Sequence, residues 1–434
     1  MISKKECEPL HSRPHQYGLY VLIWTAGVGA AVFLVWNLCE YLIINQFLKG
    51  IAPLSIHSAG GESLAEWVKD VKDLASGNSI LMNPDPAMAS ASLAMQSWYL
   101  NGSIAGWVAT AFGASVALFR SVSLVRVSLR ARPFAENVAK LILGACAAAA
   151  VFVTLGIILS LIFESIRFFS LVSWSEFLFG LQWSPQIALR EDQVGSSGAF
   201  GAVPVFTGTL LITIIAMFVA VPVGLFSAVY LSEYAKPTVR AIVKPLLEVL
   251  AGIPTVVYGF FAALTVAPWI RVLGVGLGLD VASESALAAG LVMGIMIIPF
   301  VSSLSDDVIN AVPNALREGS LGLGATRSET IRRVVLPAAL PGIVGSVLLA
   351  VSRAIGETMI VVMAAGLAAN LTANPLEAVT TVTVQIVTLL VGDQEFDSAK
   401  TLAAFALGLT LFLVTLVLNV IALRVVRKYR EQYE

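Results

Sequence analysis

The sequence predicts an all-α polytopic membrane protein, on the grounds of its composition, its long apolar stretches and the distribution of its basic residues. Of its 434 residues, 57% are hydrophobic and 13% are charged, and the mean hydropathy is +0.85. A typical soluble domain has about 25% charged residues. A chain so apolar and so poor in charge is expected to lie in a lipid bilayer.

Apolar stretches of membrane-spanning length recur along the whole chain. A helix crosses the bilayer with about 20 apolar residues. The first stretch follows basic residues, as a signal peptide does, but it is too long and lacks an A-x-A cleavage site, so we expect an uncleaved anchor. The sequence predicts eight spans, approximately at residues 17–38, 98–119, 141–163, 205–231, 246–270, 286–304, 338–366 and 401–423.

The lysines and arginines predict the orientation of these spans. With a cytoplasmic N-terminus, eight crossings return the C-terminus to the cytoplasm, and most of the 27 basic residues then fall on the inside. This is the distribution that the positive-inside rule describes. We interpret the inside clusters as topological anchors and not as sites of lipid or nucleic-acid recognition. They comprise Lys4, Lys5, Arg13, Arg120, Arg126, Arg130, Arg132, Lys140, Lys236, Arg240, Lys244, Arg317, Arg327, Arg332, Arg333, Arg424, Arg427, Lys428 and Arg430.

Between the first two spans, residues 59–90 have the pattern of an amphipathic helix followed by a connection rich in Gly, Asn and Pro. This insertion either contacts a substrate-binding protein or is a solvated embellishment, and we favour the second. The three cysteines, Cys7, Cys39 and Cys146, lie far apart and form no Cys/His cluster, so we expect neither a metal site nor a disulfide framework.

Residues 310–342 form the most distinctive inside segment, which we call the docking knob. Pro313 suits a first helical turn, after which Leu316, Ser320 and Leu323 share one helix face. Gly322 and Gly324 then end that helix. Thr326 and Glu329 have the spacing of a capping box that begins a second helix, which carries Ile331, Val334 and Val335 and is expected to break at Pro337 and Pro341. Two short helices joined by a turn suggest a docking element.

The docking knob also contains a pattern shared by ABC importer permeases: EAA, three residues, Gly, nine residues, Ile, one residue, Leu-Pro. Glu318 opens this pattern, Gly324 is its glycine and Val334 replaces its isoleucine. Gly319 and Ser320 replace the two alanines, and both residues are small enough to retain close helix packing. The chain therefore resembles these permeases. The resemblance implies coupling to an ATPase through Glu318, Gly319, Ser320, Gly324, Leu336 and Pro337.

Further stretches narrow this resemblance to the phosphate-specific importer permeases, in their PstC-type form. They are "LLEVLAGIPTVVYGF" at 246–260, "SRAIGET" at 352–358 and the long apolar segment at 200–234. The resemblance covers about residues 141–424 and implies a type I ABC importer permease core of six transmembrane helices, with two extra N-terminal ones. The expected organisation is an N-terminal membrane hairpin (1–140), a first core helix with an outside segment (141–202), the permease domain (203–425) with its coupling loop (305–337), and a cytoplasmic tail (426–434).

The resemblance implies a subunit of an ATP-driven phosphate importer in the bacterial inner membrane. Its implied partners are inorganic phosphate, a second homologous permease, an ATPase dimer that holds ATP and Mg, a periplasmic phosphate-binding protein and membrane lipid. The chain itself has no G-x-x-x-x-G-K-[ST] loop, so we expect no ATPase activity and no cofactor in it. The alternatives are a permease for another solute, such as molybdate or sulfate, and a secondary transporter, which usually shows inverted repeats.

Arg353, Glu357 and Thr358 are the candidate substrate-pathway residues. On a continuous helix, Arg353 and Glu357 are i, i+4 neighbours, and each is costly to place inside a bilayer. One interpretation is a structural ion pair that closes helix packing. The other is a phosphate pathway, in which the guanidinium fork binds phosphate oxygens and the carboxylate accepts a P–OH proton, which sulfate lacks at neutral pH. The resemblance favours the pathway.

Overall fold

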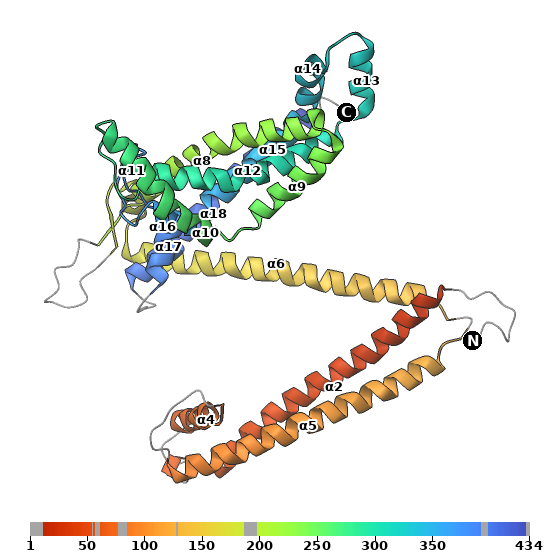
Figure 1. Ribbon diagram of the computed structural model, residues 1–434. Helices are drawn as coiled ribbons and strands as arrows, with labels where there is room; N and C mark the ends of the chain where they lie inside the picture. The colour runs from red at the N-terminus through yellow and green to blue at the C-terminus, as the bar shows by residue number, and fades with distance from the viewer. Residues whose placement is uncertain are drawn as a thin grey trace. The chain divides into compact units, whose positions relative to one another are not determined.

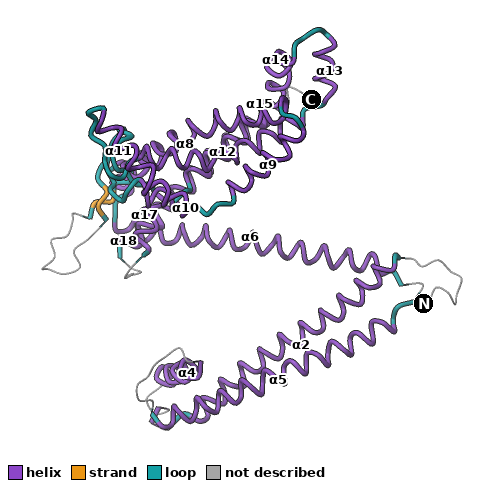
Figure 2. Tube along the Cα trace, viewed as in Figure 1, coloured by secondary structure: helices purple, strands orange, loops and turns teal. Residues whose placement is uncertain are grey.

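The computed structural model describes residues 12–53, 55–56, 61–76, 85–126, 129–185, 198–391 and 398–430, which are almost entirely helical (Figures 1 and 2). Eight helical segments are long and apolar enough to cross a membrane, as predicted. They are Pro14–Ile51 (α2), Pro86–Ser123 (α5), Ala131–Leu171 (α6), Val203–Tyr234 (α8 and η1), Thr255–Gly276 (α10, η2 and α11), Ala286–Ala311 (α12), Arg327–Ile355 (α14, η3 and α15) and Ala399–Arg424 (most of α18, which ends at Arg430). The chain divides into two compact units, Met1–Phe152 and Val153–Glu434, and the division falls within α6.

In the first unit, α2 and α5 lie side by side along most of their length (Figure 1). The indole Nε1 of Trp36 in α2 donates to the carbonyl oxygen of Gly102 in α5 at 3.0 Å. The predicted amphipathic helix is α4 (Gly61–Ser76). It buries Trp67 and Val71 against the ends of α2 and α5, which explains why its apolar residues recur on one face.

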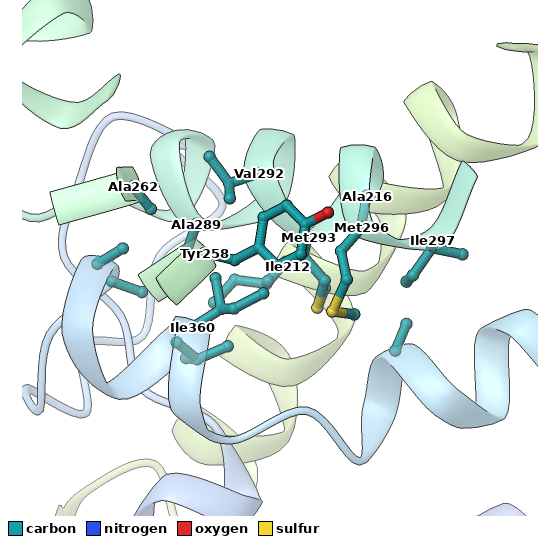
Figure 3. Packing of buried hydrophobic residues seen from close by; sticks show 14 of the residues in the cluster. Ile212, Ala216, Tyr258, Ala262, Ala289, Val292, Met293, Met296, Ile297 and Ile360 are labelled. Atoms are coloured by element: carbon teal, nitrogen blue, oxygen red, sulfur yellow. The ribbon is translucent and has the colours of Figure 1, made fainter. Parts of the chain in front are cut away.

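The second unit is built around α12, whose buried face meets α8 (Val203–Val229), α10 (Thr255–Phe261), η2 (Ala262–Val266), α15 (Leu336–Ile355) and α16 (Met359–Ala364). Figure 3 shows part of this core, in which Tyr258 and Ile360 pack near Met293 and Met296 of α12. The Tyr258 hydroxyl donates to the carbonyl oxygen of Leu250 at 3.0 Å, so the buried phenol is not left unpaired. α12 is thus the central helix of this unit.

Glycines set the distance between α8 and α12. A Cβ atom added at Gly294 would lie 2.9 Å from the carbonyl oxygen of Ala216, and one at Gly290 would lie 2.6 Å from a methyl carbon of Ile215. Helices in membranes pack through such small residues because lipid supplies little hydrophobic drive for their association. These contacts place the two helices closer than larger side chains would allow.

A second cluster closes the end of this unit far from the docking knob. A two-stranded antiparallel sheet joins β1 (Trp183–Ser184) to β2 (Ala199–Phe200). It packs with α7 (Trp174–Phe179), α17 (Val382–Leu390) and α18 around buried aromatic rings. The Trp183 indole donates to Gln385 Oε1 at 2.8 Å. The polar link keeps the sheet on α17.

The predicted fifth span begins too early. α9 (Pro237–Ala251) is a separate helix, and the chain breaks at Gly252–Pro254 before α10 starts at Thr255. Proline disfavours a helical conformation in the residue before it, so Pro254 ends the helix that the apolar pattern had continued. The span predicted from residue 246 therefore starts at Thr255.

The predicted break at Pro337 and Pro341 is also wrong. α14 (Arg327–Thr330), η3 (Ile331–Val335) and α15 form one continuous helical segment. η3 is a π-helical turn, in which the Leu336 N–H donates to the carbonyl of Ile331. This π-helical turn directly precedes Pro337, so the regular hydrogen-bond ladder is already interrupted where the proline lacks an N–H, and Pro341 is accommodated inside the helix.

Candidate functional site: the Arg353 segment and the docking knob

The candidate pathway residues lie at a helix break and not within one helix. α15 ends at Ile355, Gly356 caps it, and α16 begins at Met359. The predicted i, i+4 arrangement of Arg353 and Glu357 on one helix is therefore wrong. Within the described residues, the two side chains form no ion pair. The geometry therefore does not support the interpretation of Arg353 and Glu357 as a structural ion pair.

Glu357 has a different local role. Its Oε1 accepts backbone N–H groups of Thr358 at 3.2 Å, Met359 at 3.0 Å and Ile360 at 3.5 Å. The carboxylate thus satisfies N–H groups that the first turn of α16 leaves free. The Thr383 hydroxyl of α17 donates to the Glu357 carbonyl at 2.9 Å and fixes this residue from the other side. Oε2 has no hydrogen bond in the described part of the chain.

Arg353 is exposed on the surface of this chain, in the last turn of α15. Its guanidinium carbon lies 5.9 Å from the ring centroid of Phe300 in α12. This is within the range of a cation–π contact, which holds the side chain without using its N–H donors. Thr358 lies at the same break, where its hydroxyl faces the Gly356 carbonyl at 3.4 Å. The structure thus places all three residues where α15, and with it the candidate span, ends and before α16 begins.

The docking knob contains α13 (Asn314–Gly322) followed by a turn and α14. The predicted face of Leu316, Ser320 and Leu323 lines an open cavity of about 620 Å³, together with Gly319 and Gly324. Leu323 is 92% exposed, and a Cβ atom at Gly319 or Gly324 would meet no atom within 4 Å. An open apolar face of this kind on a short helix suits a partner surface.

Polar contacts hold the two short helices together. The predicted capping box forms, since the Thr326 hydroxyl accepts from the Glu329 N–H at 3.3 Å and the Glu329 carboxylate accepts from the Thr326 N–H at 2.9 Å. Ser320 and Thr330 hydroxyls lie 3.0 Å apart across the turn. Gly324 has a φ of +89°, which favours glycine and ends α13 as predicted.

The remaining predicted coupling residues have separate positions. Glu318 is exposed on α13, outside the lining of the cavity. Leu336 packs against the buried cluster of Ile309, Val335 and Ala339 at the knob end of α12, and the partly buried Pro337 follows it. These two residues therefore lie in the partly buried base of the docking knob and do not line its open face.

Two ion-pair clusters at the knob end were missed by the sequence analysis. Arg317 was interpreted as a topological anchor, yet its guanidinium donates to Glu233 at 3.0 Å and to the carbonyls of Ile309 and Val312, with side-chain exposures of 16% for Arg317 and 10% for Glu233. Arg327 donates to the Glu233 carbonyl. These contacts join the docking knob to η1 (Tyr230–Tyr234) and α12.

The second cluster joins α9 to α12. The buried carboxylate of Asp306 accepts from Arg240 at 2.8 Å, from Lys244 at 3.0 Å and from the side-chain amide of Asn310 at 2.9 Å. Lys244 also reaches Asp307 at 3.1 Å. The hydrogen bond with Asp306 is the largest cause of a raised pKa at Lys244. The basic residues lie on α9 and their acidic partners on α12, and no spacing in the sequence links one helix to the other, so only the fold could reveal the ion pairs.

Comparison with known proteins identifies the family. Residues 220–431 match a family described as "Binding-protein-dependent transport system inner membrane component". The "Phosphate transport system permease protein PstC 1" of Mycobacterium tuberculosis is 34% identical over 277 residues, covering 58% of this chain and 81% of the relative. The chain belongs to the PstC permease family. It is a multi-pass inner membrane protein with the fold class of the ABC importer permeases.

Other matches extend this assignment. The "Probable ABC transporter permease protein YqgH" of Bacillus subtilis is 34% identical over 245 residues, covering 56% of this chain and 75% of the relative. The N-terminal hairpin, for which the sequence pattern gave no counterpart, is matched at residues 1–153 by a family described as "Phosphate ATP-binding cassette transporter". The N-terminal unit therefore has counterparts in other proteins of that description.

A solved bacterial alginate ABC transporter, in complex with an alginate pentasaccharide-bound periplasmic protein, aligns with this PstC-family chain at a TM-score of 0.47. The alignment has 16% sequence identity and covers 68% of this chain and 97% of that chain.

Proposed function

We propose that this PstC-family chain is a permease subunit of an ATP-driven importer of inorganic phosphate, and that it forms half of the translocation pathway. The names of its relatives support phosphate as the substrate. The observation that carries the proposal is the guanidinium of Arg353, which lies in the last turn of a helix long enough to cross a membrane and has no carboxylate partner in the described chain. An arginine in that position is free to bind phosphate oxygens through its planar fork.

We propose that Glu357 selects anions that carry a proton, by accepting a hydrogen bond from their P–OH group. Its Oε1 is occupied by the first turn of α16, while Oε2 is free to accept a hydrogen bond. Hydrogen phosphate and dihydrogen phosphate carry a P–OH donor, whereas sulfate at neutral pH does not. Thr358 adds a hydroxyl at the same break. This arrangement favours phosphate over sulfate or molybdate as the transported anion.

The energy for transport is proposed to enter through the docking knob. Both termini and the docking knob then lie in the cytoplasm, where the open face of α13 receives an ATPase subunit that binds ATP and Mg. One docking knob per chain suggests a second, homologous permease and two ATPase copies. A periplasmic phosphate-binding protein delivers the substrate at the opposite end. This chain itself needs no cofactor.

Single substitutions test the pathway. Arg353 and Glu357 do not form an ion pair, so the removal of one charge does not leave the other without its partner. We expect Arg353→Gln to assemble normally and to reduce uptake of radiolabelled phosphate by about tenfold or more, through loss of charge-assisted bonds to the anion. Glu357→Gln keeps an acceptor for α16 and should reduce discrimination between phosphate and sulfate. Arg271→Gln, on the exposed surface of α11 (Ala267–Gly276), is the matched control and should transport normally.

Wild-type phosphate uptake by Arg353→Gln would contradict the pathway role. Co-purification tests the assembly separately, since we expect a distinct permease and an ATPase to accompany this chain. A functional transporter reconstituted from this permease and an ATPase alone would contradict the heteromeric part and leave the substrate unaffected.

A further inference from the structure

Arg120 lies between two apolar grooves in the first unit. The first groove, of about 350 Å³, runs between α2 and α5 and is lined on the α2 side by Tyr20 and Trp24. The second, of about 550 Å³, runs along α5 on the other side of the same residues. The residues that line both grooves are Phe112, Val116, Arg120 and Leu124. Arg120 is thus the cation that the two grooves share.

The guanidinium of Arg120 has no hydrogen bond or ion pair within the residues that the structure describes. The neighbouring hydroxyls are already used, since Ser121 donates to the Leu118 carbonyl at 3.0 Å and Ser123 to the Arg120 carbonyl at 2.7 Å. Arg120 is also exposed. Its five N–H donors are therefore available to an external anion.

The size and depth of the grooves suit lipid chains. From Arg120 to Phe112, α5 rises about 12 Å, which is most of one half of a hydrocarbon core about 30 Å thick. The first groove is lined mainly by apolar side chains, whereas the second also includes Ser115 and Ser123, and both lie on helices that are long and apolar enough to cross a membrane. Tyr20 and Trp24 lie at the same end as Arg120, as aromatic residues do at a membrane interface.

We propose that Arg120 and the two grooves bind one anionic diacyl phospholipid, with one acyl chain in each groove and the headgroup phosphate on the guanidinium. Two grooves that meet at one unpaired cation match the shape and charge of a two-chain lipid anion. The sequence had placed Arg120 only among the topological anchors. The inference concerns the first unit alone, and it stands whether or not the chain transports phosphate.

Native mass spectrometry of the purified full-length protein tests this proposal, with phosphatidylglycerol and phosphatidylcholine of equal chain length supplied at equal concentration. We expect one retained phosphatidylglycerol per chain and about fivefold or greater preference over phosphatidylcholine. Arg120→Gln should remove the preference, and Arg120→Lys should restore part of it. Val116→Trp places a larger side chain at an exposed position that lines both grooves, and it should weaken the binding of both lipids. Arg126→Gln is the matched control, because Arg126 is exposed and lines neither groove.

Other outcomes overturn the proposal. An unchanged preference in Arg120→Gln, or an equal loss in Arg126→Gln, would show general surface attraction. Release of the lipid by millimolar inorganic phosphate would indicate a site for the free anion. A photocrosslinker at position 116 that captures another protein segment in membranes, and no lipid, would show that a helix fills the grooves. Size-exclusion chromatography of each variant confirms that a lost lipid does not reflect a lost fold.

Discussion

The α8–α12 interface and the docking knob use glycine in opposite ways. In the interface, Gly290 and Gly294 lie against the backbone and side chains of α8, where no Cβ atom fits. In the docking knob, Gly319 and Gly324 face open space, and Gly324 also needs its positive φ. The same residue type therefore closes one surface and leaves the other open.

The difference also extends to what holds each region. The α8–α12 interface is held mainly by close apolar packing, whereas the docking knob is joined to the membrane core partly by ion pairs, such as Glu233–Arg317. Close packing gives a rigid element, since a well-packed core resists small changes in volume. Charged contacts around an open face let the docking knob keep its position and still offer a surface to a partner. Three comparisons of variants test this contrast.

The largest effect is expected where glycine has no room. Gly294→Leu should destabilise the protein by about 3 kcal/mol or more, at the upper end for overpacked cores, because its nearest neighbour is a backbone oxygen that cannot move away. The same change in the docking knob, Gly319→Leu, should leave stability unchanged and lower ATP-driven uptake by covering the open face. Thermal denaturation followed by size-exclusion chromatography measures the first effect, and uptake measures the second.

Equal thermal stability of Gly294→Leu and wild type would remove the contrast between the two regions. Normal uptake by Gly319→Leu would exclude the open face of α13 as the ATPase contact. Gly319 is a better position than Gly324 for this test, since a substitution at Gly324 also strains the backbone.

An intermediate effect is expected at the link between the regions. Arg317→Ala leaves Glu233 without its ion pair in a nearly buried position and should destabilise the protein by about 2 kcal/mol, less than in a fully buried pair. Arg332→Ala removes the same charge from an exposed position and serves as control. If the pair acts as a unit, Glu233→Gln with Arg317→Ala should cost less than the sum of the single changes. Strict additivity would rule out the link.

The smallest effect concerns pH. The Asp306 hydrogen bond raises the pKa of Lys244, so the folded protein binds that proton more tightly than the unfolded chain does. This contribution is fully present below the ordinary lysine value of 10.5 and is lost as pH rises through the raised pKa. Between about pH 8 and about pH 11, wild type should lose more thermal stability than Lys244→Met. Identical pH profiles would show that the α9 contact contributes nothing.

Local patterns account for the parts that the sequence predicted well. The eight spans follow from apolar length, the α4 helix from its amphipathic period, and the Thr326–Glu329 capping box and the Gly324 turn from residues within one short segment. Each of these depends on contacts between residues near one another in the chain or between the chain and lipid. The candidate site residues were found by the same means, as a local motif of the family.

The tertiary structure decided which partners the charged side chains contact. Arg353 and Glu357 have the right spacing for a pair, but the helix ends between them. The Arg353 guanidinium contacts the ring of Phe300 in α12, and the Glu357 carboxylate accepts hydrogen bonds from the first turn of α16. The sequence predicted Arg317 and Lys244 only as topological anchors, whereas in the folded protein they form ion pairs with Glu233 and Asp306. The sequence by itself determined which segments are helical and apolar, because hydrogen bonding and burial in lipid act locally. It could not determine which charges meet, because ion pairs between helices depend on how those helices pack.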